Sequence, residues 1–326
     1  MNLQKIILNA VVGSSLIAFL CCSGSKQITV AKNTEIEKEV NYIPYYLKVY
    51  EADSLYLTGN YERSFEILDS LFKEFEPLNY EYNELETYIK SAYLIGRTDA
   101  VKPFFKLLIS KYGFVIELLS YDSILNSAYQ AVHIDIKEYH VLKENFEQKI
   151  NYALRDEIDE MYYRDQFFRK LNNASLKQNE EDSALFAHQW QISDKRNEEK
   201  LIYIFEKYGF PNSKLGCNIY VKGREEQTTD VKLLLMHTSD SLRFQYFLPK
   251  LLNFIKEGES YPRIYAAMID QYNVYNGEPQ IYGTFSNVEL MYNKEKTDSL
   301  RKSIGLPKNL NYDKWRLEKI FKTSLP

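Results

Sequence analysis

The chain has 326 residues, of which 45% are hydrophobic and 26% are charged, a balance typical of a folded globular protein rather than a disordered one. Its 12 glycines and 9 prolines are few for a fold that needs many turns, which disfavours an all-β architecture. The formal net charge of −4 is spread along the chain without a dense basic stripe, so the sequence predicts no nucleic-acid partner.

The N-terminal segment has the pattern of an export signal. Lys5 supplies a positive charge, and the run from residue 6 to residue 20 is almost entirely apolar. This run is too short to span a bilayer comfortably, so a cleaved signal peptide explains it better than a membrane-spanning helix. Residues 1–22 are therefore predicted to be a signal, and residues 23–40 to be a polar tether without periodicity.

Two adjacent cysteines close the apolar run, and this ending resembles a bacterial lipoprotein signal. In such signals a cysteine thiol is diacylated and becomes the mature N-terminus, and a small residue usually precedes it. Cys22 follows the fairly small Cys21, whereas Cys21 follows the bulky Leu20, so Cys22 is the predicted attachment residue and Cys21 the alternative. The resemblance implies a lipid anchor in the cell envelope, outside the cytoplasm, on the periplasmic face or at the cell surface. Plain secretion, with cleavage near Gly24, is the competing interpretation.

Residues 41–147 have the pattern of helical hairpins. In a tetratricopeptide-like unit a small residue lets two helices approach, a glycine opens the turn between them, and an aromatic residue packs behind it. The residues that carry this resemblance are Ala52, Gly59, Ser64, Phe65 and Leu68 in one unit, and Ala92, Gly96 and residues 101–112 in the next. An array of such hairpins implies a surface for a protein or peptide partner.

Residues 148–326 are predicted to form an α-rich domain. Apolar residues recur at helical spacing from Leu154 onward. Further helices, each ended by a glycine signal, are expected over residues 194–208, 239–257 and 262–275. Residues 279–285 predict a short strand, with residues 288–291 as its candidate partner. The expected fold class is mainly α: a helical-hairpin region followed by an α-rich domain with a small β-hairpin.

A series of short motifs follows in a fixed order in this second half. The motifs are Asp165-Gln166 with Arg169, Gly209-Phe210-Pro211, His237 with Phe244-Gln245, Asp270, Gly277, Gln280-Ile281-Tyr282-Gly283-Thr284, and Arg301 with Gly305-Leu306-Pro307. The series resembles the bacterial domain-of-unknown-function family six-six-two-four over roughly residues 154–310. The resemblance implies a related fold, and it implies no known reaction.

The chain departs from the pattern of that family at three positions. Ser239 stands where members have an aspartate, Gln271 where they have an arginine, and Phe285 where they have a glutamine. If those acidic and basic groups perform chemistry in the relatives, this chain has lost part of it.

Seven polar residues of this half are candidates for a functional site: Asp165, Arg169, His237, Gln245, Asp270, Gln280 and Tyr282. In a functional interpretation His237 is a general acid or base oriented by Asp270 or Asp165, because the pKa of histidine lies near neutral pH. Arg169 and the other polar side chains would then bind the substrate. In a structural interpretation the same groups form a buried polar network, with Asp165 paired to Arg169 on one helix.

The chemistry that the sequence supports is limited. No serine or cysteine nucleophile signature accompanies His237, and the histidines do not have metal-site spacing, so neither a metal nor a cofactor is predicted. The leading hypothesis is a binding or scaffold lipoprotein of the cell envelope. The alternative is a hydrolase-like envelope enzyme with a pocket centred on His237 and Asp270.

Overall fold

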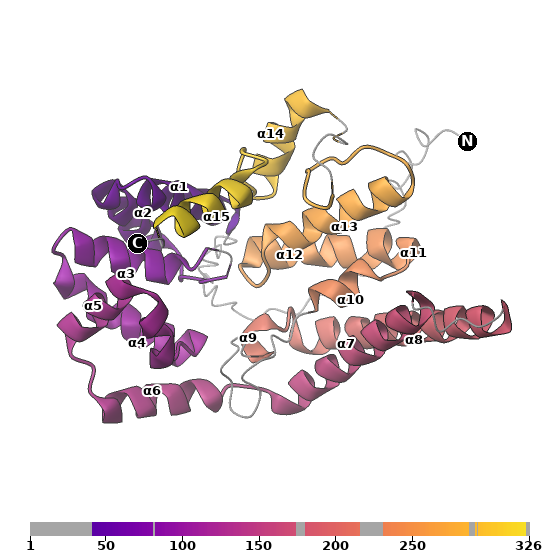
Figure 1. Cartoon of the computed structure of the whole chain (residues 1–326), viewed down its shortest axis with the longest axis horizontal. Coiled ribbons are helices and arrows are strands. Elements are labelled where there is room, and N and C mark those ends of the chain that lie inside the picture. The colour runs from indigo at the N-terminus through magenta and orange to yellow at the C-terminus, as the bar shows by residue number, and fades with distance from the viewer. Residues whose placement is uncertain are drawn as a thin grey trace, which may run out of the picture. The chain divides into compact units, whose positions relative to one another are not determined.

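The computed structural model describes residues 41–80, 82–173, 180–215, 231–286, 291 and 293–323, and the regular elements within these ranges are helical (Figure 1). The predicted signal, tether and lipid-attachment cysteines lie outside the described residues, as does Cys217. The α-helices are α1 (Ile43–Leu57), α2 (Tyr61–Glu74), α3 (Glu84–Leu94), α4 (Val101–Tyr112), α5 (Ser123–Val132), α6 (Ile136–Glu147), α7 (Tyr152–Asn173), α8 (Glu180–Tyr208), α9 (Asn212–Leu215), α10 (Lys232–Met236), α11 (Asp240–Leu242), α12 (Leu248–Glu257), α13 (Pro262–Tyr275), α14 (Lys294–Ser303) and α15 (Tyr312–Thr323). Among these described helices, none combines the length and the apolar character needed to cross a membrane.

The mainly α fold class is confirmed, but the predicted β-hairpin is wrong for the residues that the structure describes. Residues 281–286 form bends, and one isolated parallel bridge joins Gln280 to Met291. The backbone N–H groups of Ile281, Tyr282 and Thr284 donate to the side chain of Asp270 and not to a neighbouring strand. The segment therefore takes its hydrogen bonds from a helix side chain and not from a partner strand. Of the candidate partner strand 288–291, only the last residue is described.

The N-terminal helices pair as hairpins. In the α1–α2 pair, Ala52 and Ser64 are both fully buried, and the Ser64 hydroxyl donates to the Ala52 carbonyl over 2.8 Å. Helices can approach this closely only where side chains are small, which is the role that the sequence predicted for these positions. The α3–α4 pair repeats the arrangement with the fully buried Ala92.

A third left-handed turn, between α5 and α6, extends the series. The turn residues Gly59, Gly96 and His133 are equally spaced in the sequence, and all three have left-handed backbone conformations, with φ of 86°, 79° and 48°. A residue with a Cβ atom is strained by roughly 1–2 kcal/mol in this conformation. The third turn has a histidine where the first two have a glycine, so the glycine pattern in the sequence did not indicate it.

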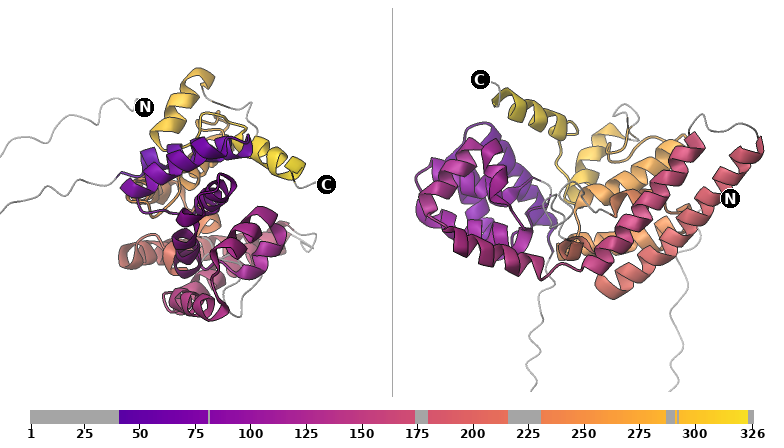
Figure 2. Two further views of the ribbon diagram at one scale, coloured as in Figure 1. Left: turned by 90° about the vertical axis from the view of Figure 1, so that its left-hand side faces the viewer. Right: turned by 60° about the horizontal axis from the view of Figure 1, so that its bottom comes forward.

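Two main apolar clusters hold residues 40–326 together as one compact unit. The first is built mainly by α1–α6, and it also takes Ile255 from α12 and Tyr312 from α15. The second is built by α7, α8, α10, α12 and α13, with α7 and α8 running side by side in Figure 2. The predicted division between residues 147 and 148 falls between α6 and α7, where one cluster gives way to the other.

Polar contacts join α1 to segments from the C-terminal part of the chain. The Tyr46 hydroxyl of α1 donates to the carbonyls of Ile255 and Ser260, over 3.2 and 2.6 Å. Two turns further along α1, the buried carboxylate of Asp53 accepts from the Tyr312 hydroxyl and the Arg316 guanidinium of α15. The C-terminal helix is therefore fastened to the first helix of the unit.

Candidate functional site

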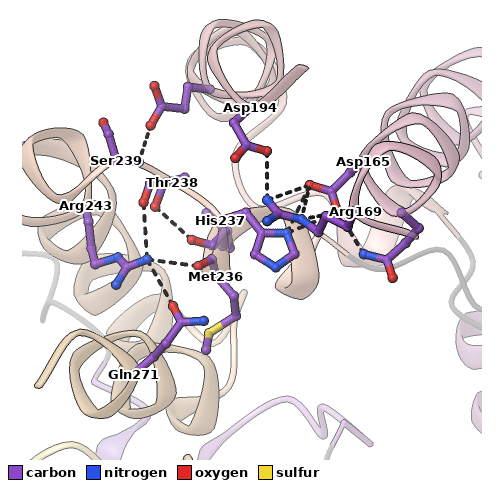
Figure 3. Close-up of polar contacts among 12 residues, drawn as sticks. Asp165, Arg169, Asp194, Met236, His237, Thr238, Ser239, Arg243 and Gln271 are labelled. Carbon is purple, nitrogen blue, oxygen red and sulfur yellow. Dashed lines mark hydrogen bonds and ion pairs between the residues drawn. The ribbon is translucent and has the colours of Figure 1, made fainter. Parts of the chain in front are cut away.

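His237 meets Asp165 where α7 and α10 pack together (Figure 3). The imidazole Nδ1 atom lies 3.0 and 3.1 Å from the two carboxylate oxygens of Asp165. The aspartate is fully buried, whereas the side chain of His237 is 20% exposed. An ionised carboxylate can only accept, so the hydrogen bond assigns the proton to Nδ1 and leaves the Nε2 lone pair for a ligand or solvent.

Two more side chains hold the Asp165 carboxylate in place. The guanidinium of Arg169, one helical turn further along α7, donates to both carboxylate oxygens over 3.1–3.2 Å. The Gln166 amide donates to Oδ2 over 2.8 Å. Burial alone would raise the pKa of Asp165, but hydrogen bonds and charge from His237 and Arg169 outweigh it and hold the pKa below its ordinary value.

Helix α8 contributes further residues to this polar cluster. Arg169 also donates to Asp194 over 2.8 Å, and its guanidinium lies 4.5 Å from the centre of the Trp190 ring. A cation stacked on an aromatic face is further stabilised by the ring quadrupole. Arg169 is thus a bridge between two carboxylates, and the chain Asp194–Arg169–Asp165–His237 links three helices.

The geometry is that of an oriented general base. A carboxylate on Nδ1 fixes the tautomer and the direction of the imidazole, and it stabilises the imidazolium that forms when Nε2 takes a proton. The bidentate contact from Arg169 moderates this effect because it shares the negative charge of Asp165. His237 therefore has the arrangement needed for proton transfer at Nε2.

The pKa of Asp194 is displaced in the opposite direction from that of Asp165. Burial raises the pKa of Asp194 to about 6, opposed by the charge of Arg169 and reinforced by that of Asp165. Its side chain is 24% exposed. Two neighbouring carboxyl groups with pKa values displaced in opposite directions are a feature of sites that move protons.

This displacement predicts a pH dependence of stability. The folded pKa of Asp194 is higher than the unfolded value of about 4, so between pH 4 and 6 the native state binds the proton more tightly. The free energy of unfolding should therefore fall by about 2–3 kcal/mol from this group as pH rises from 4 to 6. Asp194→Asn should remove this slope in urea titrations, whereas Asp298→Asn, at an exposed position of α14, should retain it. Equal slopes in parent and Asp194→Asn would contradict the assignment.

The turn that carries His237 is held by a second charged group. Arg243 is buried in the π-helical turn Arg243–Phe247, and it donates to the carbonyls of Met236 and Thr238 over 2.9 and 3.2 Å. It also donates to the Gln271 side chain over 3.0 Å. Gln271 stands where members of the resembled family have an arginine. Its side chain is therefore an acceptor for the buried Arg243. π-Helical turns are frequent at functional sites.

Sequence reasoning missed three of these residues. Arg243 was not a candidate, and Asp194 was expected at the start of a helix over residues 194–208, but α8 begins at Glu180 and places Asp194 in its interior. Glu198, one turn after Asp194, accepts the backbone N–H of Ser239 beside the histidine turn. The spacing of Asp194 and Glu198 on one face of an acidic helix was the signal that could have found them.

Helix α8 also carries buried polar groups next to this face. Ser193 and Asn197 are 1% and 3% exposed, and their side-chain polar atoms have no hydrogen-bond partner among the described residues. Buried groups of this kind ordinarily bind ordered water or a ligand. Both residues are close to Asp194 in the sequence of α8. Their side chains can therefore still donate or accept hydrogen bonds beside the site.

Asp270, Gln280 and Tyr282 lie in a different assembly. Asp270 is fully buried and binds the backbone of residues 281–284, while the Gln280 side chain accepts the N–H groups of Phe285 and Ser286. The carbonyl of Tyr282 accepts from the buried guanidinium of Arg301. These groups hold a loop in its fold, and none of these hydrogen bonds involves His237. The remaining candidate, Gln245, is exposed on the π-helical turn.

Within the described part of the chain, no group of three or more His, Cys, Asp or Glu side chains is arranged to hold a metal ion. Comparison with protein-family models, curated proteins and solved structures finds no match to this chain. The resemblance to family six-six-two-four therefore stays a prediction, and functional inference rests on the geometry of the residues.

Proposed function

We propose that the chain is an envelope lipoprotein whose C-terminal half contains a general acid–base site, with His237 as the proton-transfer group and Asp165 as the residue that orients it. The observation that carries the proposal is the contact between the half-buried imidazole and the fully buried carboxylate, which leaves Nε2 without a partner among the described residues. Asp270 is not required, because its carboxylate is used by the loop that follows α13.

The reaction class that this arrangement supports is a hydrolysis by activated water. Nε2 of His237 takes a proton from water, the hydroxide attacks the substrate, and the imidazolium returns the proton to the leaving group. Asp165 stabilises the imidazolium during the step, and Arg169 keeps the carboxylate in position. Asp194, whose pKa is about 6, is a second proton carrier within the same charged network.

The test is a panel of chromogenic carboxylic esters, phosphoesters and glycosides, assayed with the parent chain and with His237→Gln. A general base contributes roughly 10²–10⁴-fold, so the variant should lose hydrolysis by that factor. His140→Gln, at an exposed position of α6, is the matched control and should keep full activity. Equal rates in the parent and His237→Gln, or no hydrolysis by the parent, would reject the proposal.

A thermal measurement on the same variants separates catalysis from packing. Because His237 is partly exposed, its replacement by glutamine should shift the melting temperature by less than about 2 °C if its role is proton transfer. A purely structural histidine would be revealed by a clear drop in melting temperature without any activity to lose.

We also propose that Cys22 carries the lipid. The support is the sequence alone: an apolar run, a preceding small residue and the polar segment that follows. In cells fed labelled palmitate, Cys22→Ser should abolish labelling of the protein and Cys21→Ser should preserve it. The reverse result would move the anchor to Cys21, and label in both variants would favour an anchor elsewhere.

A binding role for the N-terminal helices is the second candidate function. The equally spaced turns at Gly59, Gly96 and His133 support it, because they mark three helix pairs and helical-repeat arrays need at least three repeats for stability. Arrays of this type present continuous surfaces to peptides or proteins. The two functions are compatible, since the hairpins and the His237 site are formed by different helices.

A further inference from the structure

A groove of about 480 Å³ is lined by residues of α1, α14, α15 and the segment between α14 and α15. These elements lie away from α10, the helix that precedes His237 (Figure 1). The volume of the groove is within the range of small-molecule sites, about 300–1,000 Å³. Aromatic rings of Tyr50, Tyr312 and Trp315 form part of its lining, and Pro307 lies in the opposite segment. The helices that meet here are far apart in sequence, so the groove exists only in the folded unit.

The walls of the groove are held rigidly by buried polar groups behind them. The Tyr312 hydroxyl donates to the buried Asp53 carboxylate over 2.7 Å, and Tyr312 and Tyr50 are each only 5% exposed, so their rings are fixed by the core behind the groove. The Tyr312 ring lies 5.7 Å from that of Tyr50 and 5.4 Å from that of Trp315. On the opposite side, the Pro307 carbonyl accepts from the buried Arg301 guanidinium over 2.6 Å. A preformed site of this kind loses little entropy when it binds a ligand.

The charge on the groove is positive. Lys302 and Lys308 both line it, both are exposed, and neither ammonium group has a hydrogen bond or ion pair with the residues that the structure describes. The one acidic residue in the lining, Glu51, forms an ion pair with Lys48 over 2.7 Å. A lining of aromatic residues with two lysine ammonium groups beside it is complementary to an anion that has an apolar body.

We propose that this groove binds a small amphiphilic monoanion, with its acidic group between Lys302 and Lys308 and its apolar body against Tyr50, Tyr312 and Trp315. The ligand class follows from the charge and the aromatic lining. The site is independent of the acid–base site at His237, because it is formed by other helices and shares none of its residues.

The probe for this site is 2-naphthoate, and its neutral counterpart is 2-naphthalenemethanol, both titrated by calorimetry. The chain is used without residues 1–22, so that it carries no lipid, and the compact unit that begins at Val40 is retained whole. A ligand of this size should bind with a Kd on the order of 0.1–1 mM. The alcohol should bind at least tenfold more weakly.

Charge variants decide whether the groove is the binding site. Lys302→Gln and Lys308→Gln should each weaken 2-naphthoate binding by about fivefold, the effect of one nearby unit charge in water. Glu51→Gln should tighten it, because it removes the negative charge and releases Lys48. Lys137→Gln, which removes the same charge from an exposed position of α6, should change nothing.

Three results would overturn the proposal. The first is no binding of 2-naphthoate up to 10 mM, roughly ten times the weakest expected Kd. The second is equal affinity for the alcohol. The third is an unchanged affinity in both lysine variants. Because all four substituted positions are exposed, circular dichroism should confirm that every variant is folded before it is titrated.

Discussion

Replacing Asp270 by alanine is expected to lower the free energy of unfolding by about 3–5 kcal/mol. The carboxylate is fully buried and accepts four hydrogen bonds of 2.7–2.9 Å. Three donors are backbone N–H groups of residues 281–284, and the fourth is the Thr284 hydroxyl. Without the carboxylate these donors are left without an acceptor where water has poor access.

Guanidinium denaturation of two further variants tests the reason for this loss. Asp270→Asn keeps one oxygen acceptor but turns an NH₂ group toward N–H donors, so about half of the loss should remain. Glu278→Ala, at an exposed position of the same loop, should stay within about 0.5 kcal/mol of the parent. A loss below 1 kcal/mol in Asp270→Ala would show that the loop does not depend on this carboxylate.

Local signals in the sequence predicted most helix ends. Residues 262–275 were expected to be a helix because of Pro262 at the start and Asn276-Gly277 at the end, and α13 has these bounds. The end of α12 at Gly258 follows from the same reasoning, since this glycine adopts the left-handed conformation that ends a helix, with φ of 78°. Such signals act over a few residues, so a single sequence is sufficient to find them.

Features that depend on tertiary contacts were not predictable in this way. The run at residues 279–285 has the apolar character of a strand, but its N–H groups are satisfied by Asp270 from the preceding helix. His237 could take its carboxylate from either of two distant positions, and only the packing of α7 against α10 pairs it with Asp165. Similarly, the partner of the buried Arg243 is Gln271, a residue that the sequence marked only as a departure.

Replacing Asp165 by alanine is the second large effect, with an expected loss of about 3–5 kcal/mol in the free energy of unfolding. The carboxylate is fully buried, and it accepts from Arg169, His237 and Gln166. Its removal leaves Asp194 as the remaining carboxylate partner of Arg169. It also leaves the N–H group at Nδ1 of His237 without its acceptor. Breaking a buried pair by removal of one partner is costly because the other charge stays behind.

Helix α7 contains a matched control for this prediction. Glu160 and Arg164 form an ion pair with the same four-residue spacing as Asp165 and Arg169, but the glutamate side chain is 74% exposed. Glu160→Ala should therefore cost at most about 0.5 kcal/mol, since exposed pairs contribute little. Because the helix, the spacing and the chemistry are shared, the difference between the two variants measures the effect of burial and of the His237 contact. Equal losses would mean that Asp165 does no more than a surface ion pair, and the acid–base site would lose its orienting residue.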